Sequence, residues 1–208
     1  MVLKRGALIV IEGVDRTGKT TQCNKLVECL KNKNINAEYK NFPDRTTDIG
    51  NVINSYLKSM NELSDEAIHL LFSANRWEKA KNIKKKLEEG TTLIVDRYCY
   101  SGVAFSAAKG LDINWCKAPD AGLPKPDKVF FLNLSLEKVQ RRNGFGNERY
   151  EVFDFQKKVM NAYMQLKEEN WDILDASRSM DIIQEELTQK TLSVIEDVKH
   201  KPIGKIWL

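Results

Sequence analysis

The chain has 208 residues, and its 42% hydrophobic and 30% charged residues are typical of a single globular domain, which excludes a disordered chain, a collagen-like repeat and a coiled coil. Thirty-three Lys and Arg against 29 Asp and Glu give a net charge of +4, which suits a small anionic substrate and is too weak to indicate a nucleic-acid partner. The first apolar run, residues 7–11, is too short for an export signal or a membrane span. We therefore expect a cytoplasmic protein, with a nuclear location as the alternative, and no membrane partner.

Short apolar runs alternate with helical patterns along the whole chain, which predicts one α/β domain over residues 1–208: a parallel sheet with helices on both faces. Strands are predicted at residues 7–11, 37–41, 92–95, 129–132 and 172–174, and helices at residues 19–31, 48–58, from 63–64 up to Gly90, 153–169 and 180–199, with Asp48 as the cap of the second helix.

Two segments interrupt this alternation. Residues 109–127 hold three prolines and are predicted to be a loop. Residues 140–151 (QRRNGFGNERYE) mix arginines with glycines, as a mobile flap that faces a phosphate would, although this stretch taken alone is more typical of an ordinary charged loop. The four cysteines, Cys23, Cys29, Cys99 and Cys116, show no metal-binding spacing and are expected to be reduced.

Residues 13–20 (GVDRTGKT) match the phosphate-binding loop G-x-x-x-x-G-K-[ST], and they stand between a buried strand and a helix, as the mechanism of that motif requires. In such a P-loop, backbone N–H groups surround a polyphosphate at the positive end of the helix. Lys19 is then expected to contact the β- and γ-phosphates, and the Thr20 hydroxyl to bind Mg²⁺.

The interior of this P-loop carries two charged residues. Asp15 would be repelled by bound phosphates unless a cation offsets it, and Arg16 could form a purely structural ion pair with it. The functional interpretation places Asp15 on a hydroxyl of the acceptor and Arg16 on the phosphoryl group during transfer.

The strand at residues 92–95 is followed by Asp96 and Arg97. An acid at the carboxyl edge of a parallel strand beside a P-loop can hold Mg²⁺ through water, and Arg97 can bind phosphate oxygens. The alternative for Asp96 is a helix cap.

On the long central helix, Phe72 and Arg76 are four residues apart and share a face, so they could stack on a flat base and donate to its carbonyl. The alternative for Phe72 is a place in the core. The run Lys84–Lys86 is expected to be a solvated helix face rather than a nucleic-acid site. The guanine-reading N-K-x-D motif of switch GTPases is absent from the sequence, which leaves a small P-loop phosphotransferase.

At this point the sequence resembles the eukaryotic and poxviral thymidylate kinases over essentially its whole length. The resemblance implies a P-loop kinase fold with a five-stranded parallel sheet and a mobile lid at residues 135–150. It further implies Mg²⁺-dependent transfer from ATP to dTMP in dTTP synthesis, by a homodimer. The agreeing segments are RGALIVIEGVDRTGKTTQ (5–22), NFPDR (41–45), LLFSANRWE (70–78), LIVDRYCYSGVAFSAAKG (93–110), GLPKPD (122–127), FGNERYE (145–151) and DAS (175–177).

The resemblance also implies a role for individual positions. Phe72 corresponds to the ring that stacks on thymine, Arg76 to the donor to its carbonyl, and Asp15 to the partner of the sugar 3′-hydroxyl. Arg16 corresponds to the catalytic arginine, although the lid pair Arg141–Arg142 leaves open a shared role. The other expected contacts are Arg45 and Arg97 with the dTMP phosphate; Phe42, Ser101, Gly102, Phe105, Tyr150 and Gln156 around dTMP; and Gly13, Thr17, Gly18, Thr21, Arg142 and Arg178 around ATP.

The chemistry supports a nucleoside monophosphate as the acceptor, because its phosphate is already largely ionised at pH 7, with a second pKa near ~6, and needs no general base. A site built from arginines and Mg²⁺ is then sufficient. Two alternatives are a deoxynucleoside kinase and a non-catalytic nucleotide-binding protein. The pair Arg45 and Arg97 argues against the first, and the intact Arg16, Lys19 and Asp96 argue against the second.

Overall fold

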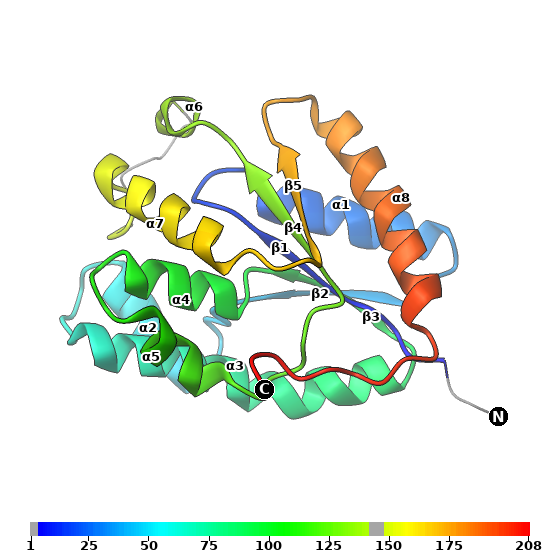
Figure 1. Cartoon of the computed structure of the whole chain (residues 1–208), viewed down its shortest axis with the longest axis horizontal. Coiled ribbons are helices and arrows are strands. Elements are labelled where there is room, and N and C mark those ends of the chain that lie inside the picture. Colours follow the sequence, from blue (N-terminus) through cyan, green and yellow to red (C-terminus); the bar gives the residue numbers. More distant parts are fainter. Residues whose placement is uncertain (1–3, 142–147) are drawn as a thin grey trace.

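Five parallel strands form the centre of the molecule (Figure 1). The structure is a computed structural model that describes residues 4–141 and 148–208. The strands lie in the order β2-β3-β1-β4-β5, so the chain builds one side of the sheet from β1 through β3 and then crosses to the other side. Ligands of such sheets bind outside the carboxyl ends of the strands, where the order reverses, and here that point is the end of β1. The strands are β1 (Leu8–Glu12), β2 (Ala37–Asn41), β3 (Thr92–Asp96), β4 (Lys128–Asn133) and β5 (Trp171–Asp175).

The two central apolar strands, β1 and β3, are buried along their whole length, because helices cover both faces of the sheet. Helices α1 (Lys19–Asn32) and α8 (Met180–Val198) pack together on one face. Helices α3 (Asp65–Glu88), α4 (Cys99–Ala107) and α7 (Phe153–Leu166) lie on the other (Figure 1). Each aliphatic side chain fully buried in this way stabilises the fold by about 1.5–3 kcal/mol.

The helix starts follow local capping chemistry. Ser64 caps α3 by accepting a hydrogen bond from the Ala67 amide at 3.2 Å, which agrees with the predicted start of this helix at residues 63–64. For α2 (Asp48–Leu57) the predicted cap was wrong: Thr47 accepts from the Gly50 amide at 3.0 Å, and Asp48 lies in the first turn, where its charge favours the helix dipole.

Several short helices were not predicted. Residues 109–127, expected to be a loop, contain α5 (Ile113–Lys117) and a 3₁₀ turn at Ala118–Asp120. Helix α4 and the short α6 (Leu136–Gln140) also went unrecognised. Segments of five to nine residues give too few turns for a helical period to show in the sequence.

The C-terminal residues run back along the lower side of the molecule in the view of Figure 1, beside the loop that precedes β4. Ile206 is fully buried, and its backbone exchanges hydrogen bonds of 2.9 Å with Gly122 and Leu123 of the loop before β4. All four cysteines are free thiols. Within the described ranges, no helix is both long and apolar enough to cross a membrane.

Candidate active site

A cavity of about 430 Å³ opens at the carboxyl edge of the sheet, which is within the usual size of a small-molecule site. Its walls come from the P-loop, the ends of β2 and β3, helices α3 and α4, and the segment just before α7. The structure brings together at this cavity most of the residues that the sequence singled out: Asp15, Arg16, Lys19, Thr20, Phe42, Arg45, Phe72, Arg76, Asp96, Arg97, Ser101, Gly102, Phe105 and Tyr150.

The P-loop has the backbone that its glycines allow. Gly13 has φ +144° and lies so close to β4 that a Cβ there would stand 2.7 Å from the Leu132 carbonyl oxygen. Gly18 has φ +94° directly before α1. Inside the loop, Lys19 donates to the Val14 carbonyl at 2.7 Å, and burial lowers the pKa of its ammonium group to about 8.

Asp15 is paired with Arg97 rather than with its neighbour Arg16. Arg97 Nη2 lies 2.5 Å from Asp15 Oδ1, and Gln156 donates to Asp15 Oδ2 at 2.8 Å. Arg16 donates from Nε to Glu151 at 2.7 Å. The structural ion pair considered for Asp15 and Arg16 is therefore replaced by two pairs that reach distant parts of the chain.

Asp96 at the end of β3 accepts a hydrogen bond from the Thr20 hydroxyl at 2.5 Å. The alternative considered for Asp96 was a helix cap, but Glu12 caps the helix that follows, α4. One Glu12 oxygen accepts from the amides of Tyr98 and Ser101, at 2.9 and 3.2 Å, at the start of α4.

Glu12 was missed by sequence reasoning, although an acid that ends a buried strand just before a P-loop is unusual enough to mark it. It is fully buried, and burial raises the pKa of its carboxyl group. Its second oxygen accepts from Ser101 Oγ at 2.6 Å and from the Tyr163 hydroxyl at 2.9 Å. Arg97 also donates to Ser101 Oγ, at 3.2 Å, so Glu12 supports the groups that hold this arginine.

Phe72 and Arg76 line the cavity from one face of α3, as predicted. Phe72 is half-buried, whereas Arg76 is 2% exposed and pairs with Asp120, which is fully buried. Asp120 was also missed, because its loop was interpreted only through its prolines.

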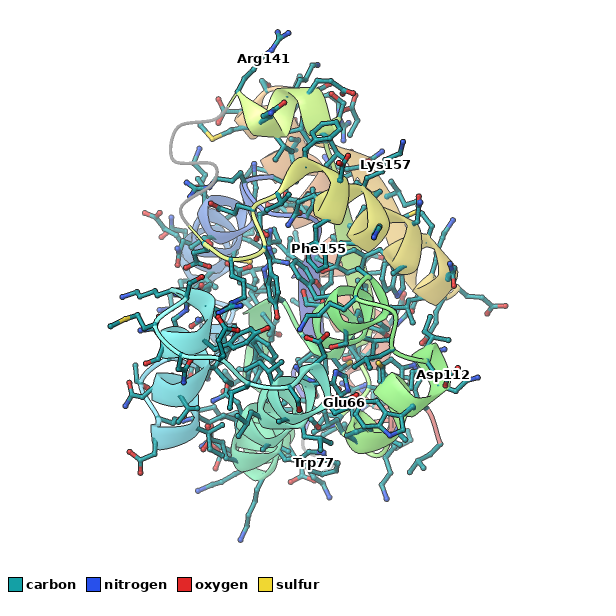
Figure 2. The ribbon with its side chains drawn as sticks, turned by 90° about the vertical axis from the view of Figure 1, so that its left-hand side faces the viewer. Glu66, Trp77, Asp112, Arg141, Phe155 and Lys157 are labelled. Carbon is teal, nitrogen blue, oxygen red and sulfur yellow. The ribbon has the colours of Figure 1, made fainter. Side chains whose placement is uncertain are left out.

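The segment before α7 supplies two carboxylates to the cavity region. Glu148 accepts from Arg45 at 2.9 and 3.2 Å, and Glu151 accepts from Arg16. Tyr150 lies between them and stacks on Phe155 with ring centroids 5.3 Å apart. Figure 2 shows Phe155 pointing from α7 into the molecule and Lys157 pointing outward.

Some predicted residues lie outside the cavity wall that the described residues form. Gln156 is buried behind Asp15 and also accepts from its amide at 3.2 Å. Arg178 pairs with Glu186 at 2.7 Å after β5. Of the run 84–86, Lys84 and Lys85 lie 3.7 Å from Glu88 and Glu89 on a solvated face, as predicted. The prediction was wrong for Lys86, which is half-buried because it pairs with Glu38 of β2 at 2.5 Å. Gly13, Thr17, Gly18 and Thr21 belong to the P-loop and the first turn of α1, and Arg142 lies outside the described residues.

Comparison with known proteins agrees with this geometry. A model of the thymidylate kinase family matches residues 11–187. A thymidylate kinase of Arabidopsis thaliana is 50% identical over 207 residues, 99% of this chain and 79% of that protein, and one of Homo sapiens is 47% identical over 211 residues, 100% of both chains. The solved thymidylate kinase of Candida albicans superposes with a TM-score of 0.87 at 38% identity, covering 97% of this chain and 98% of that one.

Proposed function

Because this chain belongs to the thymidylate kinase family, it is an ATP:dTMP phosphotransferase that makes dTDP for dTTP synthesis, and we propose how its pocket residues divide that reaction. The observation that carries the proposal is one cavity in which the P-loop, three further arginines and the ring of Phe72 meet. The P-loop marks the ATP end of this cavity, and Phe72 with Arg76 marks the end for the base.

At the acceptor end, Arg45 and Arg97 bind the dTMP phosphate. Its attacking oxygen is already ionised at neutral pH, so these arginines position it and offset its charge, and no general base is required. Each of these arginines is already paired with a carboxylate, Arg45 with Glu148 and Arg97 with Asp15. These ion pairs support the proposal that both guanidinium groups are positioned to bind an anion.

The base and sugar occupy the remaining walls. Phe72 stacks on thymine, Arg76 donates to a thymine carbonyl, and Asp15 accepts from the 3′-hydroxyl. Phe42, Ser101, Gly102, Phe105 and Tyr150 complete this part of the wall, and Gln156 acts by holding Asp15.

At the donor end, the P-loop amides and Lys19 bind the ATP phosphates, with Gly13, Thr17, Gly18, Thr20 and Thr21 shaping that site. Arg16 stabilises the charge of the phosphoryl group in transfer. Contact with adenine is assigned to Arg178 and to Arg142, which lies outside the described residues. We assign to a lid at residues 135–150, of which residues 142–147 lie outside the described residues, the role of covering the nucleotides and keeping water from the reacting phosphate.

Mg²⁺ fits the oxygen donors of Thr20 and Asp96, which lie 2.5 Å apart at the mouth of the P-loop. In the described part of the chain, no cluster of three or more His, Cys, Asp or Glu side chains is arranged to hold a metal, which suits an ion that takes its other ligands from phosphates and water. When bound, Mg²⁺ would neutralise phosphate charge. Thr20 would hold the ion through its hydroxyl, and Asp96 would hold it through water.

We also propose that the protein acts in the cytoplasm as a homodimer. Leu70 and Trp77 are 47% and 43% exposed and lie seven residues apart on α3, so they share one outer face. Sedimentation equilibrium should then give twice the 23.9 kDa of one chain, and Trp77→Ala should shift the equilibrium toward the monomer.

The role of Arg16 is tested by Arg16→Ala. Because its charge would be used in the transition state, we expect kcat to fall by about 10² to 10⁵ while the Kd values of ATP and dTMP stay nearly unchanged. Coupled ADP release gives kcat, and Lys84→Ala on the solvated face is the control. An unchanged kcat would contradict the assignment and direct attention to Arg141 and Arg142.

A further inference from the structure

The guanidinium group of Arg76 is held from behind by a carboxylate that lies outside the cavity wall of the described residues. Arg76 donates from Nε to Asp120 Oδ1 at 2.9 Å and from Nη2 to Oδ2 at 2.6 Å. Both side chains are buried, with exposures of 2% and 0%. Ser73 Oγ donates to Asp120 Oδ1 at 2.8 Å, so the carboxylate is itself fixed from α3.

The cavity side of the same guanidinium is equally constrained. Gly102 lines the cavity, and a Cβ on it would stand only 2.7 Å from Nη2 and 3.0 Å from Nη1 of Arg76. With Asp120 on one side and the Gly102 backbone on the other, the plane of the guanidinium is set before any ligand arrives. Preorganisation of this kind makes recognition selective, because no alternative arrangement of the donors is available.

A fixed guanidinium offers only hydrogen-bond donors to the base. A pyrimidine with a carbonyl group at position 4 can accept from it. A pyrimidine with an amino group there would place a donor against a buried cation, and the lost hydrogen bond would be expensive in a site closed to water. A guanidinium free to turn away would reject the amino group much less strongly.

We propose that Asp120 is a positioning residue for base selection: by fixing Arg76, it makes the pocket favour 4-oxo over 4-amino pyrimidine nucleotides. This inference rests on the proposed function, in which Arg76 contacts the base. Asp120 itself touches no substrate and acts through the orientation of Arg76.

The simpler explanation is that Asp120 only ties its loop to α3, and the chain offers a matched control for it. Arg5 and Asp127 form the same kind of pair, with hydrogen bonds of 2.8 and 2.7 Å and side-chain exposures of 8% and 11%. That pair joins the end of the same loop to β1, and neither residue lines the cavity. Asp127→Asn therefore breaks an equivalent ion pair away from the base.

The experiment measures kcat/KM for dTMP and dCMP in the wild type, Asp120→Asn and Asp127→Asn, together with KM for ATP and Tm. In Asp120→Asn we expect the dTMP/dCMP ratio to fall about 10- to 100-fold, mainly through a higher KM for dTMP, with KM for ATP unchanged. Asp127→Asn should lower Tm and leave the ratio as in the wild type. An unaltered ratio in Asp120→Asn, or an equal change in both variants, would overturn the proposal.

Ser73→Ala decides the question if Asp120→Asn fails to fold. It removes one donor from Asp120 and keeps the ion pair, so the ratio should fall about two- to tenfold in a folded enzyme. An unchanged ratio would then refute the role of Asp120. A wild-type enzyme without preference for dTMP over dCMP would instead contradict the proposed base contact of Arg76, so the two failures are distinguishable.

Discussion

At the residue scale, burial sets the charge of the P-loop lysine. Lys19 is 6% exposed, and removal from water lowers the pKa of its ammonium group from 10.5 to about 8. Below pH 8 the folded and unfolded states are both protonated, so the buried charge destabilises the ligand-free protein. That cost decreases as the pH rises from about 8 to 10.5, where both states become neutral.

Binding of a triphosphate should reverse this shift, because four negative oxygens nearby favour the charged lysine. Near pH 8 about half of the ligand-free protein carries a neutral Lys19, so ATP binding should take up about half a proton. Titration calorimetry in two buffers of different ionisation enthalpy measures this uptake. Lys19→Arg, whose guanidinium stays charged, should lose it. Equal uptake in both proteins would show that another group titrates.

Two missed residues that support the site share one property. Glu12 and Asp120 are fully buried carboxylates whose partners stand far along the chain: Tyr98 and Ser101 for Glu12, and Arg76 for Asp120. A sequence motif contains residues that are neighbours along the chain. Glu12 and Asp120 instead hold the side chains or backbone of cavity-lining residues that are distant in sequence. Only the cavity-facing partners carried a local sequence signal.

At the element scale, α3 places on one helical face the two residues that we propose recognise the base. Phe72 and Arg76 are four residues apart and meet at the cavity because a helix repeats every 3.6 residues. The same stretch of helix also packs on α2, where Phe72 and Leu71 contact the cluster of Ile53, Tyr56, Leu57, Ile68 and Tyr150. Phe72 thus packs partly on the core and partly lines the cavity, so the core alternative holds for part of the ring and stacking on a base stays a prediction.

Phe72→Ala should therefore weaken dTMP binding through lost stacking, by about 1–3 kcal/mol, and leave ATP binding intact. Leu71→Ala is the matched control, because it removes packing from the same cluster without lining the cavity. Fluorescence or calorimetric titration with each nucleotide gives the affinities. A parallel loss of ATP affinity in Phe72→Ala, or a similar loss of dTMP affinity in Leu71→Ala, would mean that Phe72 acts only through the fold.

At the scale of the whole molecule, the C-terminal segment stabilises the loop that carries Asp120. Ile206 is fully buried, and backbone hydrogen bonds at Gly122, Leu123 and Lys125 bind residues 204–206 to that loop. The isolated bridge between Pro124 and Lys205 continues the same contact. Residues 122–125 of the loop and residues 204–206 of the C-terminal segment are thereby packed as one unit.

Ile206→Ala should lower the free energy of unfolding by about 2–5 kcal/mol, because it removes a large side chain from a filled site. Urea denaturation measures the change. Ile182→Ala, at a position that is 53% exposed, should change stability by less than about 0.5 kcal/mol. Equal effects of the two substitutions would show that the C-terminal segment adds little to the fold.

The sequence by itself determined the family, the parallel α/β fold and the P-loop, all of which are confirmed. These features are encoded locally: a buried strand is a run of apolar residues, and a P-loop needs its glycines and its lysine at fixed spacing beside that strand. Strand positions were predicted to within one or two residues for the same reason, whereas α4, α5 and α6 were too short to show a period.

Only the tertiary structure decided how the charges are paired. The pocket holds several arginines and carboxylates of similar chemistry, so the sequence allowed Asp15 to pair with its neighbour Arg16. The sheet instead places the ends of β1 and β3 side by side, which brings Arg97 to Asp15, and the segment before α7 brings Glu151 to Arg16. Ion pairs form between the groups that folding brings within reach, and that distance is a property of topology rather than of spacing along the chain.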